Sequence, residues 1–203
     1  MIASIVGTLV LIAVILVVVL TTTGGKSKKQ AASSASPSAS TSASATPSPS
    51  PTPSTSYPPA TGAAVSFDGV TVKGATDLKG APGVTSKSST APAKLLYKDL
   101  VVGTGAAASP SSTVTVQYVG VLYKTGIKFD ASWDRGSPAE FSLAQVVPGF
   151  TQGIGGTTGV PPMHVGGRRI MILPAALGYG SQANGSIPAN SPLVFVVDLT
   201  KVS

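Results

Sequence analysis

Residues 113–122 read TVTVQYVGVL, a run rich in β-branched side chains. Apolar or aromatic side chains recur at every second position, at Val114, Val116 and Tyr118. Side chains two positions apart lie on the same face of an extended strand, and β-branched residues are enriched in strands. The stretch therefore predicts a β-strand with one face on a hydrophobic core.

Similar patterns occur on both sides of this strand. They predict further strands at residues 95–102, 141–143, 169–173 and 193–201. In the last of these, one face would carry Leu193, Phe195, Val197 and Leu199. The domain is therefore expected to be built mainly from strands.

One short helix is expected among these strands. Pro148 suits the first position of a helix, and Gly155 or Gly156 suits its end. Phe150 and Ile154 are four residues apart, so they would share the face that packs on the sheet. The combination predicts an α+β fold, an antiparallel β-sheet wrapped around one short α-helix.

The N-terminal segment is of a different kind, because residues 2–20 are apolar or small and uncharged. As a helix with a rise of about 1.5 Å per residue, this run could cross a hydrocarbon core of about 30 Å. A cleaved signal peptide is the alternative. Signal peptides carry basic residues before their apolar run, whereas Lys26, Lys28 and Lys29 follow the apolar run in this chain. We therefore predict a transmembrane signal-anchor helix at residues 1–22, which would place residues 2–20 in a membrane.

Two segments separate this helix from the predicted domain at residues 93–203. Residues 23–63 are expected to be a disordered linker, because residues 31–60 are almost entirely Ala, Ser, Thr and Pro, with too little large apolar surface to offset the entropy of ordering. Residues 64–92 form a lead-in with short apolar alternations such as Val70 and Val72. We expect the lead-in to pack on the edge of the domain.

Several kinds of chemistry are disfavoured by the composition. The chain has no cysteine, which excludes disulfides and thiol catalysis. Its one histidine, His164, has neither a Gly-x-Ser-x-Gly elbow nor a set of further metal ligands, and we expect it to lie in a turn. The glycine-rich residues 149–159 lack the Lys-Ser/Thr pair of a phosphate loop. The formal charge of +7 forms no basic stripe, so we expect no nucleic-acid partner, no metal and no cofactor.

Ordered sequence blocks indicate a family. Residues 117–120 read QYVG and residues 126–132 read GIKFDAS, which resembles the first signature of the FKBP-type peptidyl-prolyl cis/trans isomerases. Residues 97–105, YKDLVVGTG, resemble the start of bacterial members. Further matching blocks are VVPGF at 146–150, MHVGGR at 163–168, LGYG at 177–180, IP at 187–188 and LVF at 193–195. The resemblance covers residues 95–203 and implies an FKBP-like fold.

The resemblance also implies a set of site residues. The catalytic positions would be Tyr118, Phe129, Asp130, Tyr179 and Phe195. The substrate-binding positions would be Phe141, Val146, Val147, Phe150 and Ile187. The sequence departs from the family where Phe150 replaces a frequent tryptophan, where Ala139 replaces a frequent aromatic residue, and where residues 155–162 form a longer link.

The implied activity is isomerisation of X–Pro bonds in an apolar pocket, without a covalent intermediate. The Tyr179 hydroxyl and the Val147 N–H would hold peptide carbonyls, and Arg135 and Tyr118 would be the partners of Asp130. The implied partners are proline-containing polypeptides and macrolides of the rapamycin type, bound by a monomer. An FKBP-like binding module and a surface adhesin, each with little catalysis, are the alternatives.

Two features of the sequence point to opposite sides of the membrane for the domain. The lysines after residue 20 would retain the domain in the cytoplasm by the positive-inside rule. The long uncharged stalk is typical of the outer side. We favour an extracytoplasmic domain that acts on exported or surface proteins, with a cytoplasmic-facing or a secreted protein as alternatives.

Overall fold

The computed structural model of the chain describes residues 57–203. The predicted transmembrane helix at 1–22 and most of the predicted linker at 23–63 lie outside the described residues. Within residues 57–203, no helix is both long and apolar enough to cross a membrane.

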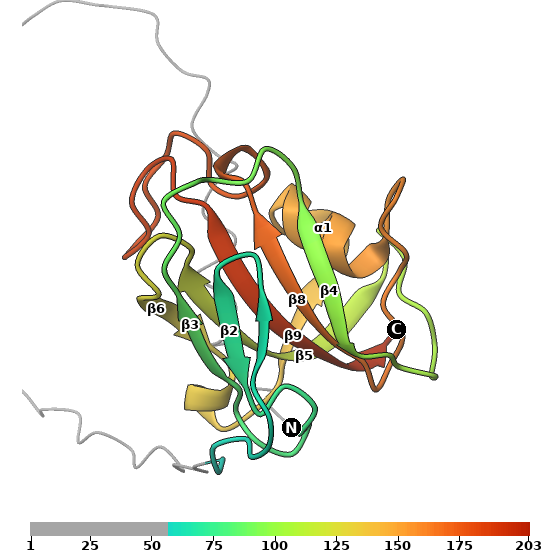
Figure 1. Cartoon of the computed structure of the whole chain (residues 1–203). Coiled ribbons are helices and arrows are strands. Elements are labelled where there is room, and N and C mark those ends of the chain that lie inside the picture. The colour runs from blue at the N-terminus through green and yellow to red at the C-terminus, as the bar shows by residue number, and fades with distance from the viewer. Residues whose placement is uncertain (1–56) are drawn as a thin grey trace, which may run out of the picture. The chain divides into compact units, whose positions relative to one another are not determined.

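An antiparallel six-stranded sheet forms the centre of the described region (Figure 1). Its strands are β4 (Leu96–Val101), β5 (Thr113–Leu122), β6 (Lys128–Ala131), β7 (Ala139–Ser142), β8 (Arg168–Leu173) and β9 (Leu193–Val202). Their order is β4-β8-β9-β5-β6, and β7 also pairs with β5. One α-helix, α1 (Pro148–Gly155), and three 3₁₀ turns, η1 (Trp133–Arg135), η2 (Leu143–Gln145) and η3 (Ala175–Leu177), complete this layer within residues 57–203. The predicted antiparallel α+β fold with one short helix is confirmed; β6 was not predicted.

One face of this sheet packs on α1. The apolar faces predicted for β5 and β9 form a hydrophobic core there, in which Val114, Val116 and Leu193 are completely buried. Phe150 and Ile154 of α1 belong to the same cluster, as their spacing of four residues predicted. Alternating side chains of two strands and one face of the helix thus form a single core.

The lead-in covers the opposite face of the sheet. It forms a three-stranded antiparallel sheet of β1 (Val65–Phe67), β2 (Val70–Lys73) and β3 (Gly83–Ser86), and Figure 1 shows β2 and β3 across the larger sheet. Val70 and Val72 are fully buried there in a second hydrophobic cluster, the second core. The larger sheet contributes Val119, Val121, Ile170, Ile172, Val194 and Val196 to that cluster. The lead-in therefore supplies part of a core, whereas the sequence pattern suggested packing at an edge.

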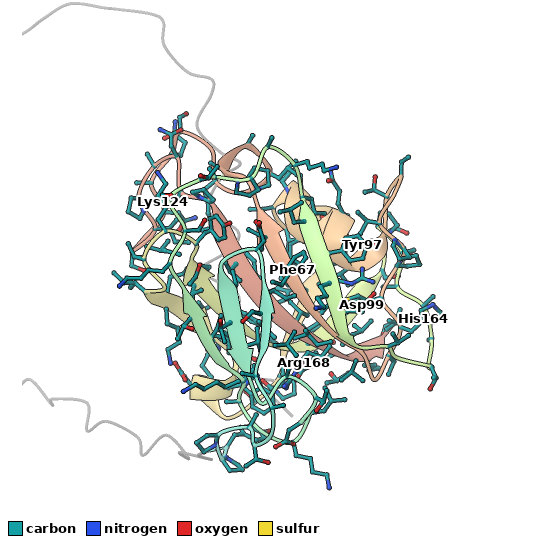
Figure 2. All side chains as sticks on the ribbon, viewed as in Figure 1. Phe67, Tyr97, Asp99, Lys124, His164 and Arg168 are labelled. Carbon is teal, nitrogen blue, oxygen red and sulfur yellow. The ribbon has the colours of Figure 1, made fainter. Side chains whose placement is uncertain are left out.

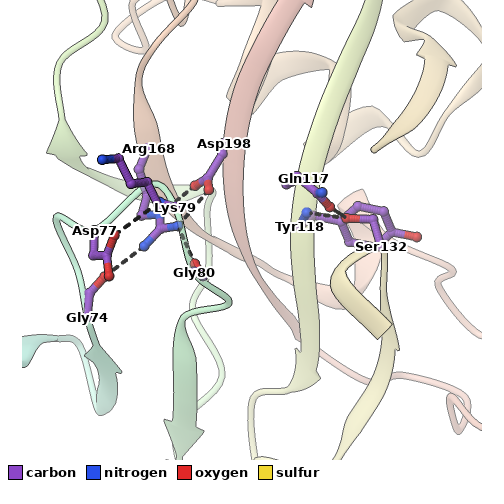
Figure 3. A network of polar contacts seen from close by, with 9 residues as sticks. All are labelled: Gly74, Asp77, Lys79, Gly80, Gln117, Tyr118, Ser132, Arg168 and Asp198. Atoms are coloured by element: carbon purple, nitrogen blue, oxygen red, sulfur yellow. Dashed lines mark hydrogen bonds and ion pairs between the residues drawn. The ribbon is translucent and has the colours of Figure 1, made fainter. Parts of the chain in front are cut away.

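A buried arginine joins the two sheets (Figure 3). Arg168 on β8 is completely buried, and its guanidinium donates to both carboxylate oxygens of Asp198 on β9, at 2.5 and 2.6 Å. The same group donates to the backbone carbonyls of Gly74, at 2.7 Å, and Gly80, at 3.2 Å, in the lead-in. The Asp198 carboxylate and the Gly80 carbonyl thus depend on this one side chain, whereas the Gly74 carbonyl also accepts the Asp77 N–H at 3.2 Å.

Residues 57–63, which precede the lead-in, also contact the domain. The ring of Tyr57 contacts that of Trp133 edge-on, with centroids 4.9 Å apart. The Ala60 N–H donates to the Ala81 carbonyl at 2.8 Å, and the Thr61 N–H donates to Asp77 at 2.8 Å. Residues 57–63, which the sequence placed in the disordered linker, therefore make specific contacts with the lead-in and with η1.

Candidate functional site

A hollow lies on the inner face of the sheet, beside β5, β6 and β9. Six of the predicted site residues line it: Tyr118, Phe129, Asp130, Tyr179, Ile187 and Phe195. They come from three strands and from the segment between η3 and β9. The antiparallel pairing of β5 with both β6 and β9 brings most of them together, because Gly120 lies opposite Asp130 on one side and Phe195 on the other.

Aromatic rings form the wall and the underlying layer of the hollow. Phe129 meets Phe195 edge-on with centroids 5.5 Å apart, and Phe150 meets Phe195 at 5.2 Å. Gly120 makes this arrangement possible, since a Cβ atom there would lie 2.6 Å from the Phe129 ring and 3.2 Å from the Phe195 ring. The glycine is thus required by a close approach of side chains.

The rim carries one carboxylate with two fixed partners. Asp130 accepts hydrogen bonds from the hydroxyl of Tyr118 and from the guanidinium of Arg135. A third contact, from Arg135 to the Tyr118 hydroxyl at 2.9 Å, closes the triangle. Both partners of Asp130 are those that the sequence predicted. Asp134, in contrast, pairs with Lys128 at the exposed surface.

The two tyrosines of the hollow hold their protons tightly. Burial raises the pKa of Tyr118 well above its usual value, and the bond to Asp130 raises it further because the phenolate would face a carboxylate. Burial and the nearby charge of Asp130 raise the pKa of Tyr179 to about 12. In the pKa of Arg135, the lowering effect of burial is outweighed by its bonds to Tyr118 and Asp130, and the net shift is upward.

Four predicted residues lie behind or beside the hollow and do not line it. Phe141 and Phe150 are almost completely buried in the core, with ring centroids 5.8 Å apart. Val146 and Val147 are half-buried and pack against the same core immediately before α1. Phe150 still reaches the site indirectly, through its contact with Phe195.

Three lining residues were missed by the sequence reasoning. Asn184, Gly185 and Ser186 border the hollow beside Ile187. Asn184 and Ile187 exchange two backbone hydrogen bonds of 2.9 Å, and Gly185 has a φ of 54°. Gly185 and Ser186 are therefore the two central residues, and Gly-Ser is a signal for a tight two-residue turn with glycine at its first position, so this dipeptide could have indicated a turn over the site.

His164 lies at another part of the surface, as Figure 2 shows beside Tyr97 and Asp99. It is exposed, and its Nδ1 lies 2.9 Å from the carbonyl oxygen of Gly105. It borders a separate hollow with Asp99, Gly103 and Arg169. Among residues 57–203, no group of three or more His, Cys, Asp or Glu side chains is arranged to hold a metal ion.

Comparisons with known proteins agree with this geometry. A sequence model of the family described as FKBP-type peptidyl-prolyl cis-trans isomerase matches residues 105–200. The FK506-binding protein of Streptomyces anulatus is 46% identical over 115 residues, which are 55% of this chain and 88% of that protein. The chain belongs to the FKBP-type peptidyl-prolyl cis-trans isomerases.

Other FKBP-type proteins extend the comparison. The probable FK506-binding protein of Corynebacterium glutamicum is 42% identical over 109 residues, which are 54% of this chain and 87% of that protein. The crystal structure of AtFKBP13 superposes with a TM-score of 0.52 at 36% identity and covers 57% of this chain and 98% of its own. This FKBP-type chain is therefore an enzyme that isomerises X–Pro peptide bonds, as the sequence predicted.

Proposed function

We propose that this isomerase lowers the barrier to X–Pro rotation by desolvation in the hollow described above. The uncatalysed barrier of about 18–20 kcal/mol reflects the loss of amide resonance on twisting. A twisted amide carries less charge separation than a planar one, so an apolar wall disfavours the planar ground state relative to the twisted state. The observation that carries the proposal is the edge-on pair of Phe129 and Phe195 beneath the rim carboxylate of Asp130.

Each part of the hollow has a proposed role in this scheme. Phe129, Ile187 and Phe195 would hold the proline ring, with Phe141, Val146 and Phe150 supporting them from behind. The Tyr179 hydroxyl and the Val147 N–H would donate to the carbonyls of the peptide. Within residues 57–203 neither group is used in an internal hydrogen bond, which leaves both free to donate. Tyr118 and Arg135 would fix Asp130 at the rim.

Removal of one wall tests the proposal. In the full chain, Phe129→Ala should lower kcat/KM for a peptide with an apolar residue before proline by about tenfold, which corresponds to about 1.4 kcal/mol of lost transition-state stabilisation. Phe67→Ala is the matched control, because Phe67 is a half-buried phenylalanine that packs in the second core. The desolvation scheme would be refuted by equal activity in the two variants after correction for the folded fraction.

We also propose a setting for the enzyme. Residues 1–22 would anchor it in a membrane as a helix, a linker would follow to about residue 56, and a monomeric domain outside the cytoplasm would act on proline-containing segments of exported or surface proteins. The uncharged run of residues 2–20 and the Ser/Thr/Pro-rich stalk support this arrangement. A reporter fused after Ser203 should be active only outside the cytoplasm. Activity confined to the cytoplasm would reverse the orientation.

Macrolide binding is proposed for the same hollow. The relatives from Streptomyces anulatus and Corynebacterium glutamicum carry FK506-binding in their names. The aromatic wall and the free Tyr179 hydroxyl suit a ligand with a ring and a carbonyl acceptor. A macrolide of the rapamycin type should inhibit turnover competitively, and Phe129→Ala should weaken that inhibition. Inhibition that is insensitive to Phe129→Ala would place the macrolide elsewhere.

A further inference from the structure

Strand β6 leaves the sheet at Ser132, the residue two positions after Asp130. Ala131, the last residue of β6, pairs with Val119, so this register continued by one residue would place Ser132 opposite Tyr118. The Ser132 N–H donates to the Tyr118 carbonyl at 3.1 Å. In a regular antiparallel pair, the Ser132 carbonyl would accept the Tyr118 N–H in return.

The side chain of Ser132 takes over that acceptor role (Figure 3). The Tyr118 N–H donates to the hydroxyl oxygen of Ser132 at 2.8 Å. The hydroxyl in turn donates to the side-chain oxygen of Gln117, which orients it. Ser132 is completely buried and Gln117 nearly so. The ladder is therefore completed by a side chain at the point where the backbone turns away.

Because the hydroxyl accepts the Tyr118 N–H, the Ser132 carbonyl is free to accept a hydrogen bond from another donor. The carbonyl accepts the N–H of Arg135 at 3.0 Å, which closes the 3₁₀ turn η1. The turn ends at Gly136, whose φ of 68° lies in the left-handed region. Because η1 begins directly after the ladder, Arg135 is carried back over the strand it has just left. Its guanidinium then reaches both Asp130 and the Tyr118 hydroxyl.

We propose that Ser132 is a positioning residue for the isomerase, because its hydroxyl replaces its own carbonyl in the ladder and so permits the turn that sets Arg135 on Asp130. The inference rests on the proposed role of Asp130 and Tyr118 in the hollow. Ser132 acts through Arg135 and touches no substrate. A residue that only stabilised the fold would affect stability without acting through one particular side chain of the site.

A double-mutant cycle in the full chain tests this coupling. Ser132→Ala removes the acceptor of the Tyr118 N–H and should lower kcat/KM, per folded molecule, by about fivefold, because small misplacements at a site are costly to the reaction. In an Arg135→Ala background, Ser132→Ala should have no further effect. Ser132→Thr retains the hydroxyl and should stay within about twofold of the unmutated protein.

Ser86→Ala is the matched control for burial. Ser86 is also buried, and its hydroxyl donates to the Tyr123 carbonyl at 2.5 Å in the second core. Its loss should lower the unfolding midpoint and leave kcat/KM unchanged. Where Ser132→Ala does not fold, Ser132→Cys serves in its place, since a thiol of similar size is a weak acceptor.

A side-chain NMR measurement separates failure of this inference from failure of the proposed function. The guanidinium signals of Arg135 should be those of a hydrogen-bonded group in the unmutated chain and in Ser132→Thr, and those of a free arginine in Ser132→Ala. This readout does not require turnover. The inference is overturned by Arg135 signals that are unchanged in Ser132→Ala, or by a fivefold loss that persists in the Arg135→Ala background. Equal activity of Phe129→Ala and Phe67→Ala would instead refute the proposed function.

Discussion

Replacement of Arg168 by methionine should destabilise the protein more than most single substitutions. The side chain has no exposed surface, and it makes four hydrogen bonds, two of them to Asp198 and two to lead-in carbonyls. Asp198 is only 5% exposed, so the substitution leaves its carboxylate buried and unpaired. Breaking a buried ion pair in this way costs about 3–5 kcal/mol.

The loss should be visible in two measurements on the full chain. At about 2–4 °C per kcal/mol for a protein of this size, the midpoint of thermal unfolding should fall by roughly 6–20 °C. Amide exchange of the lead-in should accelerate more than exchange of β5 and β9, because the Gly80 carbonyl loses its donor and the Gly74 carbonyl keeps only the Asp77 N–H. The Ala81 N–H, bonded to the Pro58 carbonyl at 3.1 Å, is a suitable reporter.

Two further variants give this prediction its controls. Arg168→Met combined with Asp198→Leu should recover much of the loss, since an apolar pair of similar volume often replaces a buried ion pair without cost. Arg169→Met removes the neighbouring arginine, which bonds Asp99 and the carbonyls of Gly153 and Pro161. It should loosen residues 155–162 and spare the lead-in. A loss below about 1 kcal/mol in Arg168→Met, or equal lead-in exchange in both single variants, would refute the reasoning.

Four other outcomes follow from the structure. Gly120→Ala should lower kcat/KM several-fold, because its Cβ would lie 2.6 Å from the Phe129 ring; the reasoning fails if the variant folds and keeps full activity. The pH profile of kcat/KM should be flat between about pH 6 and 8, because the raised pKa of Tyr118 and the pKa of Tyr179 of about 12 keep both phenols protonated there. The raised pKa of Tyr179 contributes to the free energy of unfolding. This contribution is fully present below the unfolded pKa of about 10 and is lost as the pH rises towards about 12, so denaturant unfolding measured across this pH range should show the stability falling. A fragment of residues 93–203 should bind a hydrophobic dye and aggregate, since it exposes Ile170, Val194 and their neighbours; a compact, dye-free monomer would contradict this.

The inner half of the fold could be predicted from local patterns. The spacing of two residues between apolar side chains in residues 113–122 and 193–201 predicted which side chains of β5 and β9 face the helix, and Pro148 marked the start of that helix. Strand β6 was missed because it has only four residues, of which Lys128 and Asp130 are polar. A short strand with polar residues at alternate positions has too weak a period to be distinguished from a loop.

The candidate site was predictable only in part, for a similar reason. Family resemblance supplied the site positions, and the structure brings six of them, four of which are aromatic, around one hollow. It could not distinguish residues that line the hollow from residues one layer behind, because Phe150 and Phe195 are both apolar and both buried. The difference depends on which ring lies nearer the opening, and this is a property of the packing of α1 against β9.

The sequence also contains a pattern that indicates the second core, and this pattern becomes visible when the residues on both faces of each strand are considered. β8 reads RRIMIL and β9 reads LVFVVDLTKV, so apolar residues occupy consecutive positions in both strands. A strand with one face in water alternates between apolar and polar residues, whereas a strand buried on both faces does not. Ile170 and Val194 therefore required a cover on the face opposite α1, and the period-two valines of the lead-in were the available apolar segment. The absence of alternation in one part of the chain thus predicts the packing of another, and it explains why a buried Arg168 and Asp198 can face each other beneath the segment that joins β2 to β3.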